Sequence, residues 1–415
     1  MSFDELVQAA KVYVATASHR EFLTLIGSFS MSLISLTAAV FTYLSNRTLR
    51  EELETTRDRL NVERGDAIRL QARVDERGKA LDRIEGELDA RSTRIATQEG
   101  KRVKLLEVLK QSDEDLWIRH QPIGRPADHD ARIGSRKLLV ATVANNKGGV
   151  GKSTVTLNIA AHFDKNPIVA GKKRLLIDMD YQATTSYVLT TAIEMAERES
   201  RSQVLMTYGA SALALFNARI GLNPILPTTE LVPSFYELAR HEDRLLMEWL
   251  LGEADDDLRY RLACILHSEP IVRQYDLVLI DAPPRLTTGT MNALCASTHL
   301  IVPTSFTAIS AEPVANFLAM ARAVKDKLNP NLKMIGVVET LRPTGKVGKA
   351  AEDARELARL TVQRGLQRYF PDASILEKDV PRLNQLAEEG IAYQDDLRVQ
   401  GIFEQLCAKI KEELT

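Results

Sequence analysis

The chain has 415 residues, with 54 lysines and arginines against 56 aspartates and glutamates, so its formal net charge at pH 7 is −2. This balance excludes a chain-wide basic field that would attract nucleic acid or an anionic membrane, so any such contact depends on a local patch. The length is sufficient for two or three folding units. The cysteines, Cys264, Cys295 and Cys407, are too scattered for a metal site or a disulfide framework, which is typical of a reducing cytosol.

The N-terminal part begins with a short mixed-charge segment, residues 1–21, and continues into an uncharged, largely apolar stretch, residues 22–44. A helix of that length would be about 35 Å long, enough to cross a hydrocarbon core of ~30 Å. The alternative is a buried helix of a soluble protein. More cations follow the stretch than precede it, which favours a cytoplasmic C-terminal side (Arg47, Arg50, Arg57 and Arg59 against Lys11 and Arg20). The sequence therefore predicts a single-pass protein of the inner (cytoplasmic) membrane.

Residues 47–110 are rich in charged residues and leucine and contain no proline. An apolar position recurs every seven residues, at Leu53, Leu60, Ala67, Val74, Leu81, Leu88 and Ile95. The companion position of the repeat is mixed, because Leu70 and Ile84 share it with Glu63, Arg77 and Arg91. This half-polar seam predicts a long helical stalk that pairs loosely with a copy of itself as a coiled coil. A helical hairpin, a partner's helix and a single solvated helix are the alternatives.

Residues 111–135, with two prolines and two glycines, predict a linker, and a nucleotide-binding domain is predicted over residues 136–415. An apolar run at 138–144 predicts a buried strand, and residues 154–163 predict a helix that buries Val155, Ile159 and Phe163. A glycine loop separates them. Strand, glycine loop and helix together favour phosphate binding, because backbone N–H groups converge on phosphate oxygens and the helix N-terminus adds a favourable dipole.

Within this loop, Gly148, Gly149, Val150 and Gly151 are predicted to surround the phosphates of ATP. Lys152 is predicted to bridge the β- and γ-phosphates. Ser153 would ligate Mg²⁺ through its hydroxyl, and Thr154 would lie close to the α-phosphate.

The loop departs from the pattern G-x-x-x-x-G-K-[ST], because Asn146 occupies the first glycine position and a second lysine, Lys147, precedes Gly-Gly. This arrangement resembles the deviant phosphate loop of the ParA/MinD family of ATPases. The resemblance implies a homodimer that sandwiches ATP, in which Lys147 reaches the nucleotide of the other subunit.

Two later segments predict buried strands that end in carboxylates, one before Asp178 and Asp180 and one before Asp281. Both resemble signature strands of the same family. The resemblance implies that Asp180 orients the attacking water, and that Asp281 meets the Mg²⁺ held by Ser153 at the carboxyl end of its strand. Three residues depart from the family's pattern in these loops, Tyr181, Ala183 and Arg285.

Further buried strands are predicted at residues 299–303 and 333–338, each followed by a helical pattern, and residues 184–268 are predicted to be mostly helical. Strands that alternate with helices predict a doubly wound, mostly parallel α/β sheet over residues 136–415. Residues 374–390 resemble the family's closing strand and turn. Residues 401–414 predict an amphipathic helix that packs on the core rather than on a membrane.

The predicted reaction is ATP hydrolysis, in which Lys147, Lys152 and Mg²⁺ neutralise charge and Asp180 positions water. The predicted role is to position or partition DNA or a protein complex, as a homodimer formed through ATP and also through the stalk. A protein partner is expected. Relatives bind DNA non-specifically through basic residues, and four here are candidates for such contacts, Lys346, Lys349, Arg355 and Arg382.

Two other functions stay open. One is regulation of envelope polysaccharide export, similar to tyrosine autokinases, although only Tyr369 and Tyr393 lie late in the chain and neither lies at its end. The other is a membrane scaffold or effector, for example in defence against phage, whose ATPase domain is regulatory.

Overall fold

The computed structural model describes residues 47–415, except residues 111–115, 121–122, 197, 344–346, 377–379, 382–396 and 413–415. The chain divides into two compact units, Met1–Ala96 and Thr97–Thr415. The predicted boundaries of the membrane segment, stalk, linker and nucleotide domain stay predictions.

Helix α3 (Arg47–Lys110) runs for 64 residues without interruption. The helical character predicted for residues 47–110 is therefore confirmed. The side chains of its seven-residue apolar repeat are exposed, from 40% at Leu53 to 65% at Ile95. Pairing of this helix with a second copy stays a prediction.

The predicted location in the inner membrane is contradicted by the described helices. Among the helices of the described residues, none combines the length and the apolar composition that crossing a membrane requires. Helix α3 is long enough, but charged residues occur along its whole length, which the hydrocarbon core does not tolerate. Residues 22–44, on which the prediction of a membrane span rested, lie outside the described residues, as do residues 1–21.

A nine-stranded sheet forms the centre of the second unit, with the strand order β3-β4-β2-β5-β1-β6-β7-β8 and with β9 paired to β7. Every neighbouring pair is parallel except β3 and β4. The strands are β1 (Leu139–Val143), β2 (Lys173–Asp178), β3 (Ile220–Leu222), β4 (Leu226–Val232), β5 (Tyr275–Asp281), β6 (His299–Thr304), β7 (Lys333–Arg342), β8 (Ser374–Ile375) and β9 (Val380–Pro381).

Side chains of the central strands alternate between two hydrophobic cores, one on each face of the sheet. In β1, Val140 joins the first core, whereas Leu139 and Ala141 join the second. The first core is covered by α4 (Leu116–Arg119), α8 (Ala212–Ala218), α9 (Glu237–Leu250), α10 (Arg261–Leu266), α11 (Glu269–Gln274), α12 (Thr288–Ala296), α13 (Ala308–Lys327) and α14 (Lys349–Tyr369), with two 3₁₀ turns, η1 (Ser202–Met206) and η2 (Leu258–Tyr260). The second is covered by α6 (Lys152–Lys165), α7 (Thr184–Ala192) and α16 (Leu397–Glu412).

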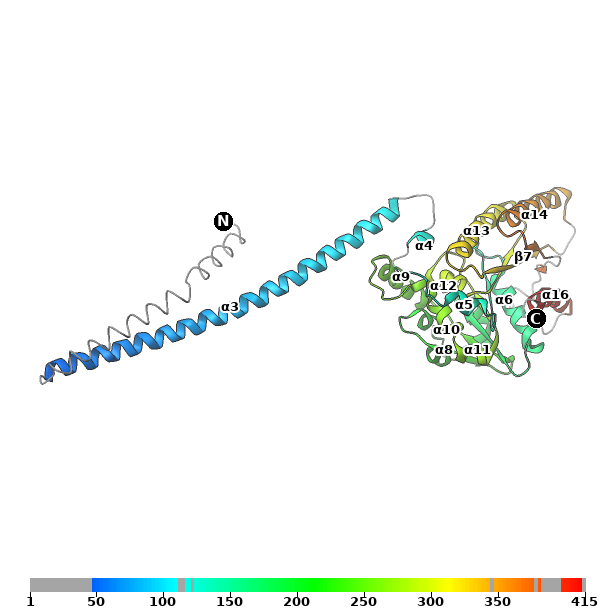
Figure 1. The fold of residues 1–415 in the computed structure, drawn as a ribbon. Coiled ribbons are helices and arrows are strands. Elements are labelled where there is room, and N and C mark those ends of the chain that lie inside the picture. The colour runs from blue at the N-terminus through cyan, green and yellow to red at the C-terminus, as the bar shows by residue number, and fades with distance from the viewer. Residues whose placement is uncertain are drawn as a thin grey trace. The chain divides into compact units, whose positions relative to one another are not determined.

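Helices on both faces of a mostly parallel sheet confirm the predicted doubly wound α/β fold (Figure 1). The last helix also behaves as predicted, because α16 packs against α6 and buries Phe403, Cys407 and Ile410. The prediction for residues 184–268 was incomplete, because it missed β3 and β4. Strand β4 carries Thr229 and Glu230 where a buried strand usually carries apolar residues. Their side chains are instead satisfied by Asp164 and by Lys173.

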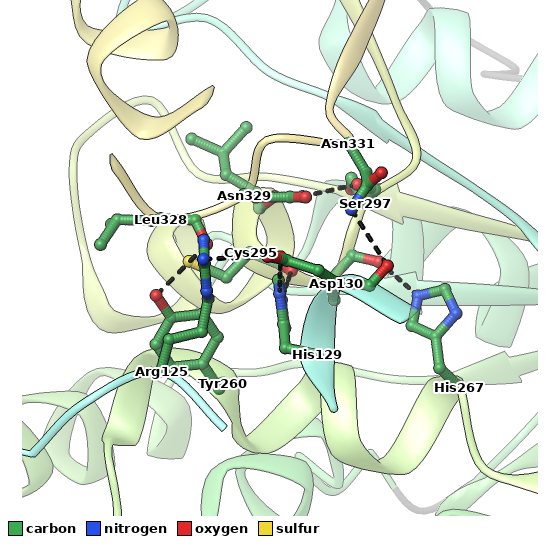
Figure 2. A network of polar contacts seen from close by, with 12 residues as sticks. Arg125, His129, Asp130, Tyr260, His267, Cys295, Ser297, Leu328, Asn329 and Asn331 are labelled. Carbon is green, nitrogen blue, oxygen red and sulfur yellow. Dashed lines mark hydrogen bonds and ion pairs between the residues drawn. The ribbon is translucent and has the colours of Figure 1, made fainter. Parts of the chain in front are cut away.

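The segment predicted as a linker contributes two short helices, α4 and α5 (His129–Gly134), with buried side chains. Trp117 of α4 stacks on Trp249 with 5.1 Å between the ring centroids. In Figure 2, His129 of α5 bonds through Nε2 to the carbonyl oxygen of Cys295 at 2.9 Å, and Arg125 lies near Leu328. This segment is therefore part of the packed structure of the second unit.

A second histidine, His267, makes a similar contact near α5, because its Nε2 lies 2.8 Å from the carbonyl oxygen of Ala296. Burial lowers the pKa of this imidazole from 6.5 to about 4. The ring is therefore neutral in the folded protein at pH values where the unfolded chain already binds a proton.

As the pH falls from 6.5 to 4, proton binding by His267 in the unfolded state should lower the free energy of unfolding by about 3 kcal/mol. Urea unfolding of the wild type and His267→Gln across this range measures the contribution, since a glutamine amide is able to donate to Ala296 without titrating. The wild type should lose more stability than the variant. Equal losses of stability in the two proteins would contradict the conclusion that protonation of His267 causes the loss.

Candidate functional site

Three adjacent strands, β1, β5 and β2, end in one row of the sheet. Val143 pairs in register with Asp281, and Asp281 with Asp178. The carboxyl ends of parallel strands meet at the same edge, where ligands of open α/β sheets bind. The predicted phosphate loop, which follows Val143, and both predicted carboxylate strands therefore meet at this edge.

The loop between β1 and α6 needs left-handed backbone at two glycines, because φ is +69° at Gly149 and +78° at Gly151. The Thr340 hydroxyl of β7 donates a hydrogen bond of 2.8 Å to the Val150 carbonyl. Asn145 bonds to the Pro303 carbonyl at 2.8 Å and accepts from the Lys147 amide at 3.1 Å. These bonds fix the loop to strands β6 and β7, so its shape does not depend on glycine alone.

Lys152 is the first residue of α6, and its side chain turns back over the loop. Its ammonium group donates to the Lys147 carbonyl at 3.1 Å. The residue is only 6% exposed. Burial lowers the pKa of this lysine, and the nearby carboxylates of Asp281 and Asp180 oppose that shift. A cation thus lies inside the loop, where phosphate oxygens would be bound.

Asp281 has one satisfied and one unsatisfied oxygen. Its Oδ2 accepts from the Thr185 hydroxyl at 2.6 Å, whereas the buried Oδ1 has no hydrogen-bond partner among the described residues. Burial raises the pKa of this carboxyl to about 6, and the Thr185 hydroxyl and the nearby Ser153 hydroxyl oppose the rise. An unpartnered carboxylate oxygen beside a serine hydroxyl fits a hard cation such as Mg²⁺.

In the parts of the chain that the structure describes, no cluster of three or more His, Cys, Asp or Glu side chains forms a metal site. Magnesium commonly binds to one or two protein oxygens and takes its other ligands from substrate phosphates and water. Ser153 and Asp281 match that sparse set, so the residues present fit Mg²⁺ bound together with a nucleotide.

The two carboxylates after β2 differ in their surroundings. Asp178 is fully buried and accepts from the Asp180 amide at 2.9 Å and from the Ser186 amide and hydroxyl at 2.9 and 2.7 Å. These bonds make Asp178 a residue that shapes the turn. The Asp180 carboxylate accepts from the Gln182 amide at 2.9 Å, and burial raises the pKa of its carboxyl. Lys152 and Arg285 oppose that rise, so both cations lie near Asp180.

The residues that depart from the family's pattern take part in one local structure. The Arg285 guanidinium donates to the Tyr181 hydroxyl at 2.9 Å, which ties the loop after β5 to the loop after β2. Ala183 has φ of +60°, a left-handed conformation that favours the glycine usually found there. The turn therefore has a left-handed residue at this position although the residue is not glycine.

Lys147 has a contact that the sequence did not predict. Its Nζ donates to the Ser310 hydroxyl at 2.5 Å, at the start of α13. Ser310 is itself buried and lies 3.0 Å from the Ser305 hydroxyl and 2.7 Å from that of Thr307. The structure therefore holds the Lys147 ammonium against its own chain.

Of the four candidate DNA contacts, the structure describes Lys349 and Arg355. Arg355 forms ion pairs of 2.5 Å with Glu339 and 2.7 Å with Glu352, and its side chain is 14% exposed. Lys349 is exposed at the start of α14. Lys346 and Arg382 lie outside the described residues. The ion pairs of Arg355 make it a structural residue rather than an available cation.

Comparison with known proteins gives sequence matches over the same region. A family model described as an AAA domain matches residues 139–334. The chain is 30% identical over 246 residues to the chromosome-partitioning ATPase Soj of Thermus thermophilus, a match that covers 59% of this chain and 82% of that protein. It is 27% identical over 249 residues to the sporulation initiation inhibitor protein Soj of Bacillus subtilis, with coverage of 60% and 86%.

Solved structures of similar fold were also found. Apo McdA of Cyanothece aligns with a TM-score of 0.52 at 18% identity, covering 66% of this chain and 99% of that one. Cobyrinic acid a,c-diamide synthase from Mycobacterium smegmatis, with bound ATP analog and magnesium, aligns with a TM-score of 0.51 at 24% identity, covering 65% and 93%. Both likenesses show a shared fold of the second unit.

Substitution of Gly151 by alanine tests the left-handed backbone of the loop. A Cβ there would meet Thr340 at an ordinary distance of 3.6 Å, so the effect comes from φ rather than from a clash. Gly151→Ala should lower the free energy of unfolding by about 1 kcal/mol. Gly148→Ala is the matched control, because no atom lies within 4 Å of the added Cβ and its φ is not left-handed. Urea unfolding compares the two, and equal effects would contradict the conformational explanation.

Proposed function

The chain belongs to the family of Soj and ParA ATPases, and we propose from this premise that it is an ATP-driven switch that positions or partitions a cargo. As a member of that family it is a P-loop ATPase whose cofactors are ATP and Mg²⁺. The roles of individual residues, dimerisation and the nature of the cargo are parts of the proposal.

The unpartnered Oδ1 of Asp281, next to Ser153 and Lys152, is the observation that carries the proposed site. A buried acceptor without a partner is unfavourable, and a cation that binds with ATP would satisfy it. We assign Ser153 and Asp281 to the metal. Gly148, Gly149, Val150, Gly151 and Thr154 would complete the phosphate cradle.

Hydrolysis needs a positioned water and neutralised phosphate charge more than covalent chemistry. Mg²⁺ supplies charge neutralisation when it is bound with ATP. Lys152, already buried in the loop, would bind the phosphates through its ammonium group. Asp180 has fewer hydrogen bonds than Asp178, so it is available to orient a water, whereas Asp178 is committed to the turn.

We assign to Lys147 a contact with the nucleotide of a second copy, as the resemblance to the ParA/MinD ATPases implies. Its carbonyl oxygen accepts from Lys152, while its ammonium group bonds to Ser310. Release of the ammonium group from Ser310 would allow it to reach the nucleotide of a second copy. This contact between two ATPase units would then form only when ATP is bound, and hydrolysis would break it, which is a population shift between two states.

Cargo is inferred from relatives. Soj of Thermus thermophilus is a chromosome-partitioning ATPase, so DNA is one cargo to consider here and a protein complex is the other. The ion pairs of Arg355 disfavour that residue as a DNA contact. No contact among the described residues favours polysaccharide export or phage defence over positioning.

The first test uses the full-length chain in sedimentation velocity with ADP or with a slowly hydrolysed ATP analogue. The wild type should sediment faster with the ATP analogue. Lys147→Ala should bind the analogue but lose this increase, because the cross-subunit contact is missing. Ser310→Ala is the matched control, since it removes the hydroxyl that Lys147 contacts within its own chain and leaves the lysine in place. The faster sedimentation with the ATP analogue should therefore persist in this variant.

An unchanged increase in Lys147→Ala would reject the cross-subunit role. The same samples mixed with plasmid DNA at low and high salt identify the cargo. DNA that sediments with the protein only in the ATP state and only at low salt would indicate phosphate contacts. An ATP-dependent increase that DNA does not alter would indicate a protein cargo.

Asp180→Asn should bind ATP and keep the nucleotide-dependent increase but lower turnover by about 100-fold or more, because the amide is a weaker acceptor for the attacking water. Steady-state phosphate release measures it. Asp326→Asn is the control, since that carboxylate is exposed and paired with Arg322. Turnover at the wild-type rate in Asp180→Asn would remove this residue from catalysis.

A further inference from the structure

The apolar repeat of α3 is uncovered over its whole described length. Leu60, Leu81 and Leu88 are 43%, 57% and 52% exposed. Such a stripe on a charged helix is usually buried against another helix. We propose that a second copy of α3 covers it, and that the two helices run antiparallel with their twofold axis at Ala72.

The direction follows from the companion position of the repeat, which holds Glu63, Arg77 and Arg91. In a parallel, in-register pair each core residue faces its own counterpart. Glu63 would face Glu63, and each arginine would face the same arginine, inside the seam. Like charges at such short range repel, and burial makes the repulsion stronger.

An antiparallel pair instead places the two repeat positions opposite each other. With the axis at Ala72, none of the three charged residues faces another charge. Leu60 then lies opposite Ile84, and Leu70 opposite Val74. Each charged core residue lies opposite an apolar one: Glu63 faces Leu81, Arg77 faces Ala67 and Arg91 faces Leu53. Each long side chain is able to lay its apolar stem on the partner and extend its charge to water.

The flanking charges agree with this register. Glu52 lies across from Arg94, and Arg59 across from Glu87. A third pair of opposite charge is formed by Arg57 and Glu85. One contact in this register is unfavourable, because Arg73 faces the Arg73 of the second copy at the axis. Such flanking pairs select partner and orientation in coiled coils.

The parallel register has fewer favourable flanking pairs. It brings Glu52 to Arg57 and Arg94 to Glu99, but also Arg59 to Arg64. Both the core and the flanks therefore favour the antiparallel pair.

The orientation limits how the ATPase units assemble. Chains that run in opposite directions leave the stalk at opposite ends, with the two Ala96 residues about 70 Å apart along the axis at ~1.5 Å per residue. The two ATPase units of one stalk pair are then poorly placed to bind each other. If the proposed ATP-dependent dimer forms, on which this step rests, it joins different stalk pairs into linear assemblies.

Cysteine cross-linking of the full-length chain tests the orientation, in a Cys264→Ser background because Cys264 is the exposed native cysteine. Leu60→Cys and Ile84→Cys are oxidised separately and as an equimolar mixture after subunit exchange. The antiparallel pair predicts a cross-linked dimer in the mixture alone. Cross-links in either variant alone would indicate parallel helices and overturn the proposal.

Absence of a cross-link in all three samples would also overturn it, because another occupant would then cover the stripe. Repeating the oxidation without residues 1–46 shows whether those residues are that occupant.

A charge exchange gives an independent readout. Glu52→Arg alone should weaken the stalk dimer, and adding Arg94→Glu should restore it, because the pair is reversed rather than lost. In a parallel pair the double variant would instead bring the introduced arginine to Arg57 and the introduced glutamate to Glu99, so the dimer would weaken further.

Lys147→Ala separates this proposal from the proposed function. Its stalk cross-link should be retained while ATP-dependent assemblies larger than the stalk dimer disappear. If the wild type also forms no ATP-dependent assemblies while its stalk cross-link is intact, the ATP-dependent dimer is rejected. The proposed orientation of the stalk helices is then still supported.

Discussion

The registration of β1, β5 and β2 is the constraint on which the site depends. It brings Asp281 and Asp178 into one row with Val143, from which the phosphate loop begins. Both carboxylates are buried, and burial raises the pKa of each. Asp178 is compensated by three hydrogen bonds, whereas Oδ1 of Asp281 has no hydrogen-bond partner in the part of the chain that the structure describes. The sheet therefore distinguishes a carboxylate that shapes the turn from one that fits a cation.

The loops after β2 and β5 are joined by a contact between two residues that the sequence marked as departures from the family's pattern. The Arg285 guanidinium donates a hydrogen bond to the Tyr181 hydroxyl. Arg285 also contributes positive charge near Asp180. The residue expected to orient water is thus near two cations, Lys152 and Arg285.

The sequence predicted the parts of the fold that depend on local pattern. Apolar runs located β1, β2, β5, β6 and β7, and the glycines located the loop between β1 and α6. Strand β4 was missed because its Thr229 and Glu230 are satisfied by distant partners, Asp164 and Lys173, rather than by an apolar core. The contact of Lys147 with Ser310 was equally invisible, since it joins residues that are 163 positions apart.

The uncharged stretch at residues 22–44, which lies outside the described residues, led to a membrane prediction that the described helices contradict. Helix α3 is long, but it carries charged residues along its whole length. The charges in the α3 seam carry more information than its apolar residues. Leucines every seven residues are compatible with either direction of pairing, whereas Glu63, Arg77 and Arg91 are compatible with few alignments of the two helices. Residues that weaken a coiled coil thus specify its geometry.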